Sequence, residues 1–485
     1  MSGQERSAIR VGLKAFAAAF LILLLLMVFA GVLTRIVPSG AYERRIENGR
    51  TLVVPGSFLE APRPDYPVWR WFTAPAEVLW SSDNLTVITI ILFLVFIGGA
   101  FAVLEKGEVM RFVLAGVVAR FQGRRFLLMA VVMLFFMVNG SVLGIYEEVV
   151  PLVVFIVPLA HAMGWDSLTG LGMSLLALAF GFSAAITNPF TVGIAQTIAG
   201  LPLFSGAWLR VLFLGATYTA VFLFVRRYAR RIERDPSRSL VFVEDAAARA
   251  LRGTPSEAAM PEGKRAGLRR ASAWLAAWVG CAVVFIVTIT RFPSVAFVAF
   301  PAVGLFFLVA GAGAGLFAGL GTRGVMRAFL QGVRGVAPAI VLILMAMSVK
   351  HIIVSGGIMD TILRAASGAI VGTSRYVAAF LVYLATLVLE FFIGSASAKA
   401  FLMMPILSPL ADLVGITRQT TVLAFDIGDG FANMFYPSNA LLLIALGLTV
   451  VGYPKWIRWT LPIQGIMFLV SMGFLALAVA VGYGP

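Results

Sequence analysis

The sequence contains very few of the side chains that form disulfides or bind transition metals. In 485 residues there are one cysteine and two histidines. A single thiol cannot form an internal disulfide, and with two histidines it is too little for a zinc or iron cluster. Cys281 lies within the apolar stretch "AAWVGCAVVF", so we expect a small buried residue there. These absences exclude an internally disulfide-stapled fold and a Cys/His metal centre.

Charged residues are also scarce. They make up 13% of the chain and hydrophobic residues 60%, whereas about a quarter of a soluble domain is charged. Many windows exceed about 18 apolar residues, the length of a membrane-spanning helix, as at 15–33 and 466–484. The first window is too long for a signal-peptide core and lacks a small-residue cleavage site, so it predicts an uncleaved span. The pattern predicts an all-α, multi-pass membrane protein, surrounded by lipid.

Signatures of nucleotide-driven transport are missing as well. Gly263-Lys264 is followed by Arg265 and has no glycine five residues before it, so no phosphate-binding loop is present. The net charge of +15 does not indicate a nucleic-acid partner, because the basic residues gather in one segment. Residues 226–270 hold twelve Arg or Lys and six Asp or Glu, which is typical of a cytoplasmic loop.

The tendency of cytoplasmic loops to be rich in Lys and Arg also predicts the topology of the chain in the membrane. The loop at about 38–83 has five basic and six acidic residues and suits the outer side, whereas 105–125 is basic and suits the cytoplasm. The N-terminus is predicted inside and the uncharged tail outside. We therefore divide the chain into an N-terminal transmembrane repeat (1–225), a basic cytoplasmic linker (226–270) and a C-terminal transmembrane repeat (271–485).

The two halves repeat one another in an ordered series of matches. Residues 157–170 resemble 408–421 at a constant offset, and further matches follow after small gaps. They are Gly181-Phe182 with Gly430-Phe431, Pro189 with Pro437, Gly200-Leu201-Pro202 with Gly452-Tyr453-Pro454, and Trp208-Leu209-Arg210 with Trp456-Ile457-Arg458. The span after Trp208 ends at the basic cluster and so starts outside, whereas basic residues before the last span place its start inside. The copies are predicted to be inverted, as in many secondary transporters.

Each copy has an apolar run broken by polar residues at the same place. In copy one it is "GFSAAITNPFTVG" (181–193), and in copy two "LAFDIGDGFANMFYPSNALL" (423–442). Proline breaks or kinks a helix, and non-helical backbone at membrane depth is tolerated only against protein or a water-filled cavity. Asp426 and Asp429 lie in the second stretch, and Asp429 stands between two glycines where we expect the helix to be interrupted. Paired broken helices of this kind indicate a binding site.

Two further polar islands precede the broken segments. They are "NGSVLGIYEEVVP" (139–151) and "EFFIGSASAKAFLMMP" (390–405), each flanked by apolar stretches that are short for separate spans. Each is predicted to be a re-entrant hairpin with small residues at its tip. Glu390 is predicted to lie at a membrane edge, outside the site. Lys399 is expected to compensate the charge of Asp426 or Asp429, or else to snorkel to the membrane surface.

The candidate substrate-binding residues come from these four segments. Intramembrane carboxylates are expensive and indicate function, whereas serines there often only pack and asparagines often only cap helices. A coupling cation, Na⁺ or H⁺, is expected at Asp426, Asp429 and Asn188, and no other cofactor is expected. The full set is Glu147, Glu148, Asn188, Thr191, Ser395, Ser397, Lys399, Asp426, Asp429, Asn433, Ser438 and Asn439.

Several of these stretches resemble the YfcC/DcuC family of bacterial carriers in the ion transporter superfamily. The similarity covers nearly the whole chain, through "VPSGAYER", "FIGGAFAVLEKGEVM", "YEEVVP", "NPFTVGIAQTIAGLPLFSG" and "PLADLVGITRQTTVLAFDIGDGFANMFYP". The resemblance implies inverted repeats with hairpins and broken helices, an elevator-like motion and a homodimer. It also implies a small carboxylate or amino acid as substrate. The chain departs from the family pattern at 394–400 and at "FYPSNALL", both within the proposed site.

Together with the resemblance, the sequence therefore predicts a multi-pass secondary transporter of the bacterial inner membrane, working by symport or exchange. Two alternatives belong to other classes: a membrane-embedded enzyme and a sensor with a transporter-like fold. "DIGDG" superficially matches the motif of intramembrane aspartyl proteases, but that motif needs Gly at Asp426 and a second catalytic Asp on another helix. No signalling domain is evident to favour a sensor.

Overall fold

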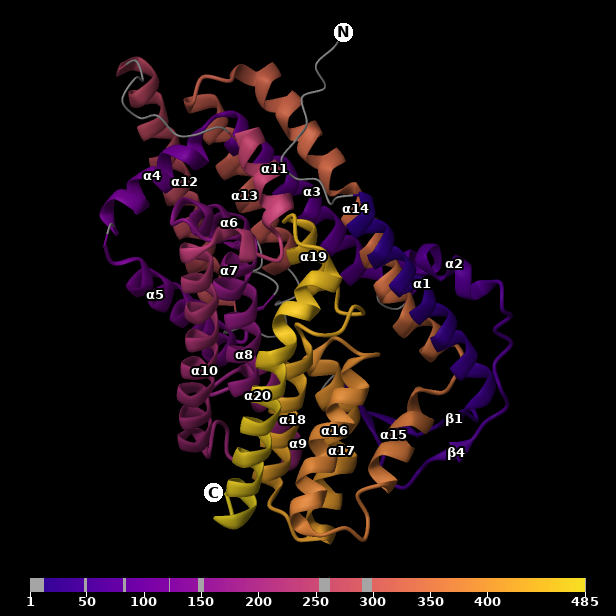
Figure 1. Cartoon of the computed structure of the whole chain (residues 1–485). Helices are drawn as coiled ribbons and strands as arrows, with labels where there is room; N and C mark the ends of the chain where they lie inside the picture. Colours follow the sequence, from indigo (N-terminus) through magenta and orange to yellow (C-terminus); the bar gives the residue numbers. More distant parts are fainter. Residues whose placement is uncertain are drawn as a thin grey trace.

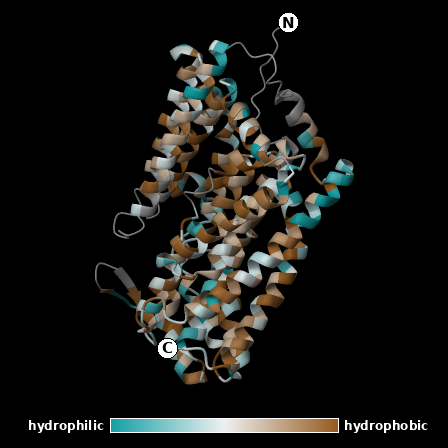
Figure 2. Cartoon of the chain, turned by 90° about the vertical axis from the view of Figure 1, so that its left-hand side faces the viewer, coloured by the Kyte–Doolittle hydropathy of each residue, from teal (hydrophilic) through white to brown (hydrophobic). Residues whose placement is uncertain are grey.

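The chain folds into long apolar helices with a small β-structured loop at one end. The computed structural model describes residues 13–47, 50–81, 84–121, 123–146, 152–252, 262–289 and 299–484. Within these ranges, eight helices are long and apolar enough to cross a membrane. Figure 2 shows hydrophobic residues along the lengths of the helices and hydrophilic ones mainly near their ends. The predicted multi-pass helical fold is confirmed.

The loop after the first span contains short strands, so the expectation of helices alone was incomplete. Two antiparallel pairs form, β1 with β4 and β2 with β3. The loop docks on α15 (Met359–Gly368), where Asp360 accepts hydrogen bonds from the Tyr42 backbone N–H (2.9 Å) and the Arg44 guanidinium (3.0 Å). The elements up to the second span are α1 (Leu13–Ile36), β1 (Gly40–Ala41), β2 (Arg44–Glu47), β3 (Arg50–Val53), β4 (Leu59–Glu60), α2 (Arg70–Glu77) and η1 (Val78–Trp80).

One group of helices packs through small residues. α3 (Asn84–Lys106) lies against α13 (Ala299–Phe317) and α14 (Gly321–Ser355), and α12 (Glu262–Ile289) lies against α13. A Cβ on Gly332 of α14 would approach the carbonyl oxygen of Gly98 of α3 to 2.1 Å, so the backbones of α14 and α3 are in contact. Close contact between small residues is how membrane helices gain packing energy without a hydrophobic driving force. Cys281, on α12, is exposed rather than buried as expected.

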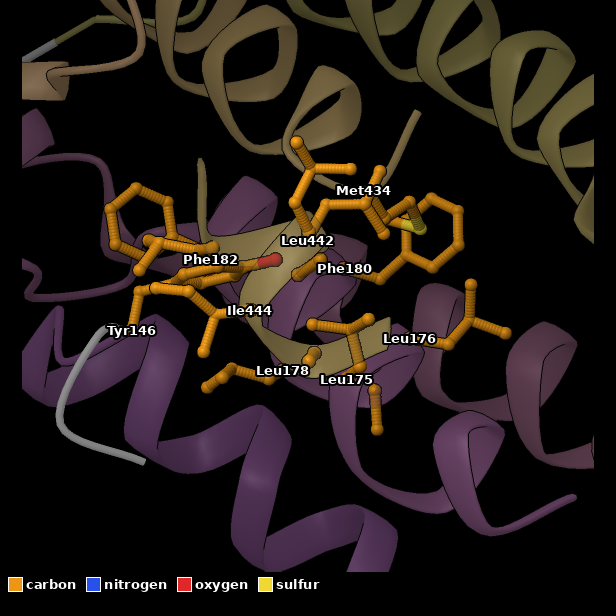
Figure 3. Packing of buried hydrophobic residues seen from close by; sticks show 14 of the residues in the cluster. Tyr146, Leu175, Leu176, Leu178, Phe180, Phe182, Met434, Leu442 and Ile444 are labelled. Carbon is orange, nitrogen blue, oxygen red and sulfur yellow. The ribbon is translucent and has the colours of Figure 1, made fainter. Parts of the chain in front are cut away.

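The second group holds the two broken helices. In the first half, α7 (Ser167–Leu171), η4 (Gly172–Leu176) and α8 (Ala177–Ala184) run on to a break, and η5 (Pro189–Gly193) and α9 (Ile194–Ala199) follow. In the second half, α18 (Arg418–Ala432) leads to a break and then α19 (Ala440–Gly447). α8 packs on α18. Figure 3 shows side chains of the first unit, such as Phe180 and Phe182, packed with Met434, Leu442 and Ile444 of the second.

The helices that follow the breaks run in opposite directions. Tyr483, just after α20 (Tyr453–Ala480), donates to the Gly206 carbonyl at the start of α10 (Ala207–Arg234), while Lys455 at the start of α20 pairs with Glu244 of α11 (Phe242–Arg252), beyond the end of α10. α10 and α20 are therefore antiparallel neighbours (Figure 1). α11 lies toward one end of the molecule, and β1, β4 and the C-terminus lie toward the other.

The described parts of the polar islands include helix ends, and the helices there are longer than expected. The runs 125–143 and 396–414 each form 19 helical residues, long enough to cross a membrane. The first island begins with η2 (Asn139–Leu143), which follows α5 (Arg125–Val138), and α6 (Val153–Ala162) comes after it. The second island runs from the last residue of α16 (Arg375–Glu390) into α17 (Ala396–Val414). α16 and α17 lie side by side (Figure 1). The remaining elements are α4 (Val109–Arg120) and η6 (Pro236–Arg238).

Candidate functional site

The two breaks have the same local construction. Asn188 caps η5, accepting from the backbone N–H groups of Phe190 (2.9 Å) and Thr191 (3.3 Å). Asn439 caps α19 in the same way, accepting from the N–H groups two and three residues on at 3.0 and 3.2 Å. An Asn side chain at this position satisfies donors that the new helix would leave free. The capping interpretation of both asparagines is therefore correct for their carbonyl oxygens.

The first break is held between both polar islands. Ser141 of η2 accepts from the Ile186 N–H (3.2 Å) through its Oγ and from the Thr187 N–H (3.2 Å) through its backbone oxygen. From the other half of the chain, the Ser397 hydroxyl donates to the Phe190 carbonyl (3.2 Å). Residues far apart in sequence thus meet at this break.

Asp426 and Asp429 lie on one helix and are both buried. The helix α18 stays regular through both aspartates and ends at Ala432, so the expected interruption at Asp429 was wrong. The flanking glycines serve close packing instead. A Cβ on Gly430 would lie 2.2 Å from the Ser183 nitrogen, and one on Gly428 2.8 Å from Cβ of Thr386. Three residues of helix place the two carboxylates one turn apart.

Lys399 lies against two carboxylates. Its Nζ is 2.5 Å from Oδ1 of Asp429 and also contacts the Glu390 carboxylate. All three side chains are at most 2% exposed. The predicted pairing of Lys399 with one of the aspartates matches this geometry, whereas a snorkelling lysine would reach the surface. The placement of Glu390 at a membrane edge was wrong, because the turn between α16 and α17 brings it onto Lys399.

Asp426 has different neighbours. The Thr191 hydroxyl of η5 lies beside it, and the guanidinium of Arg210 acts on it electrostatically. Within the described ranges, Asp426 makes no ion pair shorter than 4 Å. Arg210 is itself buried and fixed, because it donates to the carbonyls of Ile186, Phe204 and Ser205 and to the Tyr483 hydroxyl.

Sequence reasoning missed both Glu390 and Arg210. Arg210 was used only as part of a repeat match, although a charge three residues into an apolar span is itself a functional signal. Its matched residue in the other half, Arg458, is not fully buried. Glu390 stands immediately before a helix break, and only the folded turn shows that it faces inward.

The remaining predicted residues have mixed positions. Asn433 accepts a hydrogen bond from the Asn439 side-chain amide (2.8 Å), Ser395 caps α17 by accepting from the Ala398 N–H (3.4 Å), and Ser438 is part-buried. Glu147 and Glu148 lie outside the described residues. Asn188 contacts backbone rather than the aspartates. Among the described residues, no group of three or more His, Cys, Asp or Glu side chains is arranged to hold a metal ion.

The apolar helices and the buried charges between two broken helices define a polytopic membrane protein of the transporter class. The model of the C4-dicarboxylate anaerobic carrier (DcuC) family matches residues 16–480, so the chain belongs to this family, and it is a multi-pass transporter of the bacterial inner membrane. The family and its relatives point to a transporter rather than an enzyme.

Three individual proteins are similar to this chain along most of its length. "Putative basic amino acid antiporter YfcC" of Escherichia coli K12 is 30% identical over 461 residues, covering 90% of this chain and 89% of that protein. An uncharacterized protein of Haemophilus influenzae is 26% identical over 409 residues, covering 82% and 76%. The solved YdaH transporter of Alcanivorax borkumensis has 17% identity and a TM-score of 0.41, covering 97% of this chain and 99% of that chain.

Proposed function

We propose that this protein is a secondary active transporter for a small amino acid that carries a net positive charge. The observation that carries the proposal is the charge of the buried cluster. Among the residues that the structure describes, three carboxylates and two cations belong to this cluster, so in their charged forms they leave one excess negative charge. The members are Glu390, Asp426, Asp429, Lys399 and Arg210.

An uncompensated buried charge is costly, so the loaded site should contain a positive group. A basic amino acid supplies one net positive charge and leaves the cluster neutral. A zwitterionic amino acid would leave the charge of the empty cluster unchanged, and one co-transported Na⁺ or H⁺ would be required to neutralise it, for which Asp426 beside Thr191 is the proposed place. A dicarboxylate would bring two further negative charges and require several co-transported cations. The name of the Escherichia coli relative, a basic amino acid antiporter, agrees with the first case.

The other site residues are proposed to bind the substrate's carboxylate and polar atoms. Ser397 and Thr191 lie at the junction of α17 with the first break, and Asn433 and Ser438 lie at the second. In the proposed site, these hydroxyl and amide groups from both halves surround the bound substrate. A site shared by two halves is opened to one side and then the other when one element moves relative to the rest.

Inverted repeats and an elevator-like motion are part of the proposal. The antiparallel arrangement of α10 and α20, whose sequences match, supports an inverted relationship between residues 1–225 and 271–485. The paired asparagine caps at the two breaks support it too. The linker at 226–270 is proposed to lie in the cytoplasm, and a homodimer follows from the family resemblance.

Thermal-shift measurements on the purified protein test the substrate class. L-arginine, L-lysine, L-aspartate, succinate and fumarate are each added with and without sodium. A ligand at about 100 times its Kd raises the free energy of unfolding by about 2.7 kcal/mol. L-arginine or L-lysine is expected to raise the melting temperature, and succinate is not. Stabilisation by succinate in sodium, with none by the basic amino acids, would replace this proposal with dicarboxylate transport.

A further inference from the structure

Of the two cations in the cluster, Lys399 is the one that pairs with two carboxylates. Arg210 is fixed by four hydrogen bonds to carbonyls and a hydroxyl. In the described part of the chain, the Lys399 ammonium forms ion pairs with the carboxylates of Glu390 and Asp429. A lysine ammonium is a compact charge on a flexible stem, so it can remain with one carboxylate while leaving the other.

The two carboxylates come from different elements. Glu390 is the last residue of α16 and Lys399 lies in the first turn of α17, so the two residues flank the same interhelical turn. Asp429 lies on a different helix, in the last turn of α18. The Lys399–Glu390 pair can therefore persist within α16–α17 while Asp429 is given up to another cation. The space at Asp429 already holds an alkyl ammonium, which is the chemical group of a basic amino acid.

We infer that Lys399 takes the place of the substrate's positive group on Asp429 in the empty carrier and thereby lets the empty carrier return across the membrane. This inference rests on the proposed function, since it requires a cationic substrate. In the loaded state the substrate's ammonium occupies Asp429 and Glu390 retains Lys399. Lys399 thus determines whether the protein carries out net transport or exchange alone.

The net charge of the cluster shows what loss of the Lys399 charge would do. In the wild type the empty cluster has one excess negative charge and the loaded cluster has none. Without the lysine charge, the empty cluster has two excess negative charges and the loaded cluster has one. The loaded Lys399→Gln protein therefore has the same charge as the empty wild type, which crosses, whereas its empty form has a larger charge and is held back because buried charge is unfavourable in the membrane.

Two flux measurements in proteoliposomes separate these steps. Net uptake of radiolabelled L-arginine into vesicles without internal arginine requires the empty carrier to return. Counterflow into vesicles preloaded with unlabelled L-arginine requires only the loaded carrier to cross. We expect Lys399→Gln to lower net uptake at least about tenfold more than it lowers counterflow. Lys399→Arg, which keeps the charge, should keep both fluxes.

The double variant Glu390→Gln/Lys399→Gln is the matched control. It removes one negative and one positive charge, so the cluster keeps its wild-type charge, and it should recover net uptake to within about threefold of wild type. It also keeps the test decisive if Lys399→Gln alone does not fold. Thermal melting with and without L-arginine verifies folding and binding for each variant.

Three results would overturn the role of Lys399. They are equal loss of net uptake and counterflow in a folded Lys399→Gln, normal net uptake in that variant, and no recovery of net uptake in a folded double variant. A wild type that shows neither flux with L-arginine would instead overturn the proposed substrate, and the inference with it.

Discussion

Lys399 and Glu390, nine positions apart in the sequence, meet at the turn between α16 and α17, and Asp429 of α18 shares the same ammonium. Breaking a buried ion pair by removing one partner leaves an uncompensated charge, which typically destabilises a protein by about 3–5 kcal/mol. Here the second carboxylate keeps Lys399 paired when either one is neutralised. Single neutralisations of Glu390 or Asp429 should therefore leave the protein folded and report on transport.

Glu390→Gln should weaken substrate binding. With Glu390 neutral, Lys399 is held by Asp429 alone and competes with the substrate, and the cluster no longer has an excess negative charge. We expect KM for L-arginine to rise at least about tenfold, a loss of about 1.4 kcal/mol, in proteoliposome uptake. Asp412→Asn, which removes a carboxylate from the half-exposed pair with Arg418 on the same chain segment, is the control and should stay within about twofold. An unchanged KM in Glu390→Gln would remove this residue from the site.

Gly430→Ala should disturb the contact between the two broken helices. The added Cβ would lie 2.2 Å from the backbone nitrogen of Ser183, and backbone cannot move aside cheaply. Overpacking of this kind costs about 1–3 kcal/mol, occasionally more, and should lower both the melting temperature and uptake. Gly473→Ala on α20 has open space around its Cβ and should behave like the wild type. Equal melting temperatures for the two variants would show that α8 and α18 are not in this close contact.

Much of this arrangement follows from the sequence, and the exceptions have physical reasons. Apolar length identified the spans, and proline and asparagine identified both breaks, because these residues act locally on the backbone. The glycines beside Asp429 were misinterpreted, since a glycine that permits an unusual conformation and one that permits close packing look the same in sequence. Glu390 was missed because only tertiary contacts distinguish an inward-facing charge from one at a helix end. Arg210 was missed although its position within an apolar span was a signal in the sequence. The short strands of the loop were not predicted.

The topology can be tested with single cysteines. The loop charges predict that residues 226–270 and the C-terminal tail lie on opposite sides of the membrane. Cys281 is exposed and must first be replaced by serine. Ser237→Cys and Gly484→Cys should then differ, with only Gly484→Cys labelled by a membrane-impermeant thiol reagent in intact cells. Labelling of both, or of neither until lysis, would contradict the inverted repeats.

Glu77, in the loop predicted to lie outside, should make stability depend on pH. Burial raises its pKa, but hydrogen bonds from Arg70, Thr73 and His351 outweigh this and lower the pKa to about 2. A carboxyl with a depressed pKa in the folded state stabilises it fully above its unfolded value, about 4.3, and this contribution is lost as pH falls toward 2. The wild type should melt at a higher temperature than Glu77→Gln at pH 7, and the difference should shrink between about pH 5 and 2. A constant difference would contradict this assignment.

The most direct test of the buried cluster as the transport site is uptake by Asp429→Asn. The substitution keeps the shape of the side chain and leaves Lys399 paired with Glu390, so the melting temperature should remain close to that of the wild type. It removes the carboxylate that is proposed to bind the substrate's ammonium, so both net uptake and counterflow of radiolabelled L-arginine should fall to background. Uptake within about twofold of wild type, a change of about 0.4 kcal/mol in transition-state free energy, would contradict the account.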